Sequence, residues 1–102
     1  MFTSFEIDHV AHLVRDLEQA IQTHCALSGV QEIHRESIEN GDAIAVLLGN
    51  PQDSSAPTIE LLSPQGEKGL LAKRLSKAGE GFHHICYRVD DIRAHLLSLI
   101  HI

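Results

Sequence analysis

Residues 7–17 read Ile7-Asp8-His9-Val10-Ala11-His12-Leu13-Val14-Arg15-Asp16-Leu17, and residues 82–92 repeat the pattern as Phe82-His83-His84-Ile85-Cys86-Tyr87-Arg88-Val89-Asp90-Asp91-Ile92. The offset between the two stretches is a constant 75 residues, so that His9 falls on His84 and Asp16 falls on Asp91. A sequence that repeats itself at a fixed offset indicates one structural unit used more than once. We therefore expect a duplicated module, and the two stretches mark where each copy begins.

The first copy carries the signals of a strand, a helix and three further strands. Its opening segment, residues 5–14, is rich in residues that are typical of strands. Asp16 and Ser28-Gly29 frame a helix, because an acidic N-cap and a glycine after the last turn satisfy free backbone groups at the helix ends. An Asn40-Gly41 dipeptide predicts a hairpin turn. The three later strands are expected at residues 30–38, 43–48 and 58–62.

The second copy is expected to be incomplete. A short linking helix that contains Leu70, Leu71 and Leu75 ends at Gly79, and a strand follows at residues 82–89. Asp90-Asp91 then cap a helix at residues 92–99, where the chain runs out. The predicted fold class is α+β with paired βαβββ modules. The expected division is a first module at 1–64, a linker with a short helix at 65–80, and the start of a truncated second module at 81–102.

Length and charge exclude several classes of function. The chain has 102 residues, of which 43% are apolar, enough for one domain with a core. Asp and Glu number 14 against 8 Lys and Arg, and the net charge of -6 argues against nucleic acid or an anionic membrane as the main partner. No apolar run approaches the ~20 residues of a membrane span, and the N-terminus lacks the parts of a signal peptide. We expect a cytoplasmic protein with two reduced, packed cysteines.

Two of the eight histidines occupy equivalent positions in the repeat. A pseudo-twofold relation between the modules brings His9 and His84 near a common axis, an arrangement suited to a shared metal. Glu60 is a third candidate ligand, because a strand carboxylate between Ile59 and Leu61 points opposite to them. The counterpart of Glu60 would lie near position 135, beyond the chain. We interpret the other six histidines as solvated or hydrogen-bonded: His12, His24, His34, His83, His95 and His101.

These residues resemble the vicinal oxygen chelate (glyoxalase/bleomycin resistance) superfamily and, within it, the methylmalonyl-CoA epimerase family. The motifs that carry the resemblance are Ile7-Asp8-His9-Val10-Ala11, Ile59-Glu60-Leu61-Leu62-Ser63-Pro64, Gly79-Glu80-Gly81-Phe82-His83-His84-Ile85-Cys86 and Val89-Asp90-Asp91-Ile92. The resemblance implies a curved, half-open mixed sheet around a divalent metal. It also implies that His9, Glu60 and His84 hold this metal together with a glutamate from the last strand of the second module.

The implied activity is removal of the proton α to a thioester by a metal-dependent epimerase or isomerase. Mixed imidazole and carboxylate ligation suits Co, Mn, Ni or Zn, and the implied partner is a small acyl thioester, with a homodimer as the expected assembly. Ala45 stands where the family has a carboxylate acid/base, so the catalytic residues stay unassigned. Two alternatives are open: a glyoxalase I-like lactoylglutathione lyase, and a non-catalytic small-molecule-binding module of the same fold.

The end of the chain is expected to be artificial. Leu97–Ile102 stops inside the expected helix without a cap, and its hexapeptide is the translation expected of a sequencing-library adapter. We therefore expect a C-terminally truncated and inactive fragment of an enzyme. The alternative is a natural short protein that completes its sheet by dimerising.

Overall fold

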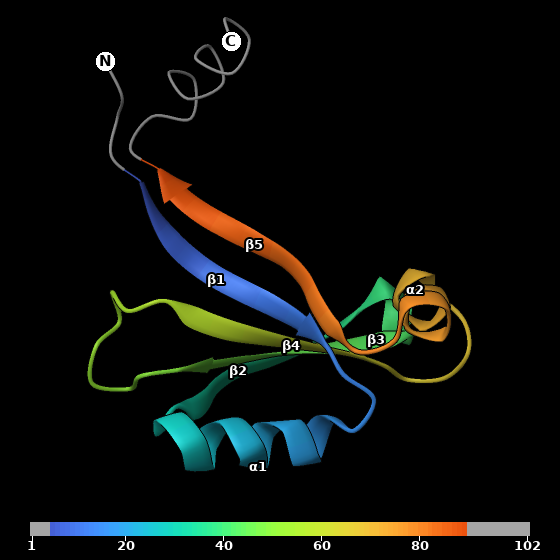
Figure 1. Cartoon of the computed structure of the whole chain (residues 1–102), viewed down its shortest axis with the longest axis horizontal. Helices are drawn as coiled ribbons and strands as arrows, with labels where there is room; N and C mark the ends of the chain where they lie inside the picture. Colours follow the sequence, from blue (N-terminus) through green and yellow to red (C-terminus); the bar gives the residue numbers. More distant parts are fainter. Residues whose placement is uncertain (1–4, 90–102) are drawn as a thin grey trace, which may run out of the picture.

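The structure, a computed structural model, describes residues 5–89 and is built on a five-stranded mixed sheet (Figure 1). The strand order is β2-β3-β4-β1-β5; β1 runs parallel to β4, and the other neighbouring pairs are antiparallel. This is the α+β fold predicted from the repeat. The strands are β1 (Phe5–Leu13), β2 (Gln31–Ile38), β3 (Ala43–Gly49), β4 (Thr58–Pro64) and β5 (Gly81–Val89), each within two residues of its predicted bounds.

The two helices also begin and end where the sequence predicts. Helix α1 (Leu17–Ser28) starts at Asp16, whose carboxylate accepts a hydrogen bond of 3.1 Å from the backbone N–H of Gln19. It ends at Gly29, which takes the left-handed conformation that glycine adopts without strain. Helix α2 (Leu70–Ala78) ends at Gly79. No helix within residues 5–89 is long and apolar enough to cross a membrane.

The hairpin between β2 and β3 also positions α2. Its turn is a short 3-10 segment, Glu39–Gly41, in which Asn40 takes a left-handed conformation. The carboxylate of Glu39 accepts a hydrogen bond of 3.3 Å from the backbone N–H of Leu71, at the start of α2. The turn thereby fixes α2 over one end of the sheet.

Alternation along the strands divides the core between the two faces of the sheet. Helix α1 covers one face (Figure 1), where it buries a cluster of Leu17, Ile21, Val46, Leu48 and Leu61. Helix α2 covers only part of the other face, over a cluster of Ala11, Leu13, Ala43, Ala45, Leu62 and Leu71. The uncovered part of this second face, along β4, β1 and β5, holds the polar residues that the sequence singled out.

The pairing of β1 with β5 obeys the offset of the repeat. His9 faces Cys86, Val10 faces Ile85 and Ala11 faces His84. When each residue is replaced by its counterpart 75 residues away, the pair of His9 and Cys86 becomes the pair of His84 and Ala11. The pair of Val10 and Ile85 maps onto itself. This is the register that a twofold axis through Val10 and Ile85 requires.

The two irregularities in this pairing are equivalent as well. In β1 the register skips Asp8, because Ile7 pairs with Tyr87 and the next pair is His9 with Cys86. In β5 the register skips His83, because Ala11 pairs with His84 and His12 pairs with Phe82. Asp8 and His83 are themselves 75 residues apart.

The division of the chain at residues 64 and 80 stays a prediction. The helix expected at 92–99, with His95 and His101, lies outside the described residues.

Candidate metal centre

The three predicted ligands lie on three adjacent strands and point to the same face. Ala11 in β1 is the register partner of both Glu60 in β4 and His84 in β5, so these two side chains flank it in one row across the sheet. His9 lies two residues before Ala11 and therefore shares its face. Ala11 is fully buried, and its small methyl side chain leaves room above it for the three longer side chains.

The ligand atoms form a nearly regular triangle. His9 Nε2 lies 3.2 Å from His84 Nε2, and Glu60 Oε1 lies 3.7 Å from His9 Nε2 and 3.6 Å from His84 Nε2. In the plane of these atoms, the point equidistant from all three lies about 2.0 Å from each, close to the roughly 2.0–2.2 Å bonds that Zn²⁺ makes to imidazole nitrogen and carboxylate oxygen. The donor set and its spacing therefore fit a divalent transition-metal ion.

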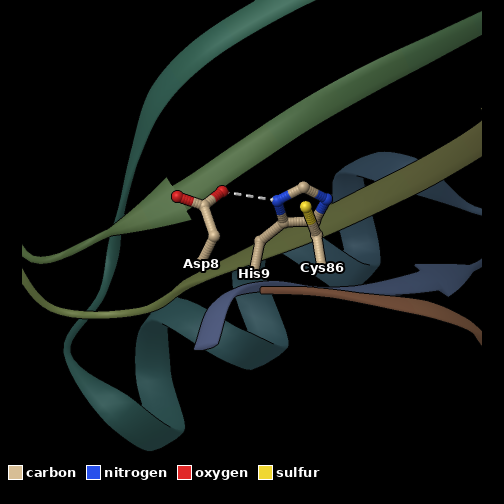
Figure 2. Close-up of side chains that lie close together, drawn as sticks. All are labelled: Asp8, His9 and Cys86. Atoms are coloured by element: carbon tan, nitrogen blue, oxygen red, sulfur yellow. Dashed lines mark hydrogen bonds and ion pairs between the residues drawn. The ribbon is translucent and has the colours of Figure 1, made fainter. Parts of the chain in front are cut away.

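Asp8 sets the orientation of His9. The bulge at Asp8 breaks the strand alternation, so that Asp8 and His9 lie on the same side although they are adjacent in sequence. Asp8 Oδ2 lies 2.8 Å from His9 Nδ1 (Figure 2). Because a carboxylate accepts, His9 Nδ1 donates in this hydrogen bond. The tautomer with its proton on Nδ1 has its lone pair on Nε2, which faces Glu60 and His84.

His83 has the equivalent place beside His84. The two rings are in contact through their Nδ1 atoms, 2.7 Å apart. Partial burial, followed by the positive charge of Arg74, lowers the pKa of His83, so its ring is neutral near pH 7 and can accept a hydrogen bond. When His84 Nδ1 donates this bond, the lone pair of His84 also lies on Nε2.

This protonation pattern calls for a cation in the triangle. Two imidazole lone pairs and a carboxylate oxygen face one another within 3.7 Å, and they repel unless a proton or a metal ion lies between them. The side chains of His9 and Glu60 are only 17% and 18% exposed, so water screens this repulsion incompletely. The arrangement is therefore favourable for an ion that all three residues share.

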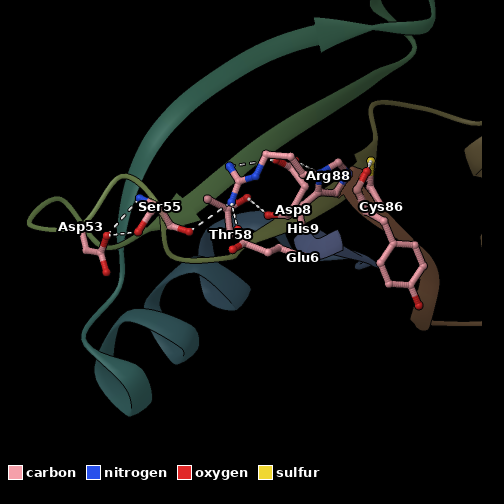
Figure 3. A network of polar contacts seen from close by, with 9 residues as sticks. Glu6, Asp8, His9, Asp53, Ser55, Thr58, Cys86 and Arg88 are labelled. Carbon is pink, nitrogen blue, oxygen red and sulfur yellow. Dashed lines mark hydrogen bonds and ion pairs between the residues drawn. The ribbon is translucent and has the colours of Figure 1, made fainter. Parts of the chain in front are cut away.

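A network of polar contacts holds the Asp8 end of the site in place (Figure 3). Arg88 donates to Glu6 at 3.1 Å and to the backbone carbonyl of Ser55 at 3.2 Å, and its other terminal nitrogen lies 3.8 Å from Asp8. Thr58 donates to the backbone carbonyl of Asp8 at 3.3 Å. The loop before β4 is thus tied to β1 and β5 at the bulge, which restricts the movement of the Asp8 carboxylate.

The sequence predicts the three candidate ligands but assigns no role to the residues that lie beside them. His34 lies 3.7 Å from Glu36 on the exposed strand β2, as the interpretation of a solvated histidine requires. The sequence pattern places His83 among the solvated or hydrogen-bonded histidines and gives Asp8 no role. The signal that could have found both is their equivalence in the repeat, each directly before a candidate ligand. Ala45 is buried on the same face as Glu60 and has no group that can move a proton.

Comparisons with known proteins show the family of the chain and agree with its fold. Residues 8–99 match the family described as the Glyoxalase/Bleomycin resistance protein/Dioxygenase superfamily. Human mitochondrial methylmalonyl-CoA epimerase is 37% identical over 97 residues, which cover 91% of this chain and 51% of the human protein. The ethylmalonyl-CoA/methylmalonyl-CoA epimerase of Cereibacter sphaeroides is 38% identical over 90 residues, which cover 86% of this chain and 63% of that protein.

A solved structure shares the fold at comparable similarity. It is a methylmalonyl-CoA epimerase in complex with methylmalonyl-CoA and NH₄⁺, which aligns with a TM-score of 0.71 at 29% identity and covers 91% of this chain and 66% of that one. The chain thus spans between half and two thirds of the length of the relatives that it matches.

Proposed function

Because the chain belongs to the glyoxalase/bleomycin resistance protein/dioxygenase superfamily, we propose that it binds a divalent metal through His9, Glu60 and His84 and serves an epimerase or isomerase that removes the proton α to a thioester. The observation that carries the proposal is the triangle of ligand atoms, all within 4.8 Å of one another on three adjacent strands. Epimerases that act on methylmalonyl-CoA are among its relatives, which supports an acyl-CoA thioester as the substrate.

The metal, when bound, supplies a Lewis acid that stabilises the negative charge developing on the thioester carbonyl oxygen as the α-proton leaves. The chain's own residues prepare for this. Imidazole carries no negative charge, so His9 and His84 would hold a divalent ion without offsetting its charge, and among the three residues only Glu60 offsets part of it. Asp8 and His83 keep the Nδ1 protons in place, so that both Nε2 atoms are available for the ion.

Proton transfer requires a group other than Ala45. An alanine can neither accept nor donate a proton, and the buried position of Ala45 makes it part of the apolar wall on the α2 side of the site. We propose that the acid/base and the fourth ligand come from a second-module glutamate, expected near position 135. The homodimer and the cytoplasmic location also stay predictions.

Deuterium exchange tests the proposal. A form of the protein that is extended to include the complete second module, with its expected glutamate, is incubated in D₂O with racemic methylmalonyl-CoA and Co²⁺ or Mn²⁺, and uptake at the α-carbon is followed by mass spectrometry. We expect metal-dependent uptake that the matched variant Glu60→Gln lacks, since an amide is a poorer ligand than a carboxylate of the same shape. Metal-loaded protein that exchanges no deuterium, or that processes a glutathione hemithioacetal instead, contradicts the epimerase assignment.

A further inference from the structure

A second set of metal-binding side chains shares His9 with the site described above. Cys86 in β5 is the register partner of His9, and the bulge places Asp8 on the same side of β1. One ligand atom from each of Asp8, His9 and Cys86 lies within 4.8 Å of the other two. Figure 2 shows the Cys86 thiol against the His9 imidazole, with the Asp8 carboxylate at the Nδ1 side of the ring.

The second set differs from the first in chemical softness. The first set has two imidazoles and a carboxylate, which accept Co²⁺, Mn²⁺, Ni²⁺ or Zn²⁺, whereas the thiolate of the second set favours the most thiophilic ions, of which Cd²⁺ is the clearest example. The Cys86 thiol makes only a long contact of 3.9 Å with the backbone carbonyl of Tyr87, so little is lost when it turns to a metal. The cysteine is half-buried and therefore reachable.

The surroundings of Asp8 can accommodate an ion as well. The positive charge nearest to Asp8 is Arg88, whose Nη1 lies 3.8 Å away and whose other terminal nitrogen is bonded to Glu6 and Ser55. Arg88 can keep these two partners while Asp8 turns to a cation. Within residues 5–89, Cys25 belongs to no comparable group of ligands, so the assignment singles out Cys86.

We propose that Asp8, His9 and Cys86 form a second metal site, which takes thiophilic divalent ions and competes with the first set for His9. On binding, the Cys86 thiol releases its proton to solvent and the proton on His9 Nδ1 moves to Nε2, so that Nδ1 can bind the ion. The thiolate and the Asp8 carboxylate together neutralise the ion. Binding at this site stands on its own donors, and only the competition depends on the proposed function. A thiophilic ion bound here removes one imidazole from the first site and so inhibits it.

Cadmium titration tests the second site directly. The S-to-Cd charge-transfer absorbance in the ultraviolet is recorded as Cd²⁺ is added to the reduced chain and to the variants Cys86→Ser and Cys25→Ser. We expect the band in the unmodified chain and in Cys25→Ser, and a loss of Cd²⁺ affinity of more than about 100-fold with loss of the band in Cys86→Ser. A band that survives in Cys86→Ser, disappears in Cys25→Ser or is absent from the unmodified chain overturns the proposal.

Two further variants separate this site from the first one. Glu60→Gln and His84→Ala remove donors of the first set alone, so both should keep the cadmium band while losing Mn²⁺ binding, measured by electron paramagnetic resonance. The outcome that contradicts a separate site is loss of the band in these variants while circular dichroism shows an intact fold. In that case the Cys86 thiolate binds the ion only together with the ligands of the first set. If the unmodified chain shows the cadmium band but binds no Mn²⁺, the first site alone is contradicted.

Discussion

The Asp8-His9 pair on β1 and the His83-His84 pair on β5 are the same structural device with different chemistry. Each begins with a bulge residue, places two adjacent side chains on one face, and leaves the Nε2 atom of its second residue in the shared triangle. In the first pair the partner of the ligand is a carboxylate, and in the second it is a neutral imidazole. His9 is also the less exposed ligand, at 17% against 40% for His84.

The difference shows which properties the duplication preserves. The backbone register and both bulges follow the twofold relation, so the position of each orienting side chain is inherited by both copies. The identity of that side chain is free to differ. A carboxylate partner makes an imidazole more basic than a neutral partner does. We therefore expect His9 to be the stronger ligand, and His84 to be the one whose contribution can be adjusted.

Removing the stronger ligand should have the largest effect. His9→Ala deletes a donor common to both metal sets, and we expect Mn²⁺ affinity to fall by more than about 100-fold, beyond the loss typical of an outer partner. Isothermal titration calorimetry measures this loss. His12→Ala is the matched control, since His12 lies on the opposite face of the same strand. Equal losses in the two variants contradict the assignment.

Removing the charge of Asp8 should give the Asp8-His9 pair a neutral partner, as in the His83-His84 pair. Asp8→Asn keeps the shape and one accepting oxygen but removes the charge, and we expect Mn²⁺ affinity to fall about 10- to 100-fold. Glu6→Gln is the control, because Glu6 also bonds Arg88 but does not contact a histidine in the described structure. Wild-type affinity in Asp8→Asn means that the charge of the partner is irrelevant.

Substitutions of His83 should change the Mn²⁺ affinity less, and the direction should depend on the residue that replaces it. His83→Ala leaves the Nδ1 of the more exposed ligand to water, and we expect a loss of about 10-fold, the lower limit for an outer partner. His83→Asp gives β5 the pair found in β1 and should bind Mn²⁺ more tightly than His83→Ala does. Equal affinities for these two variants in calorimetry argue against an orienting role.

The smallest effect is expected at Cys86. Its counterpart in the repeat is Ala11, so Cys86→Ala makes the two strands alike at this position. Because Cys86 is only half-buried, we expect the free energy of unfolding in urea to change by less than about 0.5 kcal/mol and the Mn²⁺ affinity to stay the same. A marked loss of stability indicates that the thiol packs in the core.

Much of the fold could be predicted because its signals are local. Asp16 and Gly29 frame α1, and the offset of 75 residues implies that β1 and β5 meet about a twofold axis. The prediction of the three ligands rests on that symmetry and on the resemblance. The bulges could not be predicted, since a bulge leaves the composition of a strand unchanged while turning one side chain to the other face. Asp8 and His83, the two bulge residues, were missed for that reason.

The most direct test of the metal centre is the stoichiometry of Mn²⁺ binding in the chain and in Glu60→Gln, measured by isothermal titration calorimetry with circular dichroism to monitor folding. Glu60 is the only one of the three ligands that contributes a charge, and it belongs to the first set alone. The account predicts one Mn²⁺ per unmodified chain and at least about a 10-fold weaker affinity in the variant. A folded chain that binds no Mn²⁺, or a variant that binds as tightly as the unmodified chain, contradicts it.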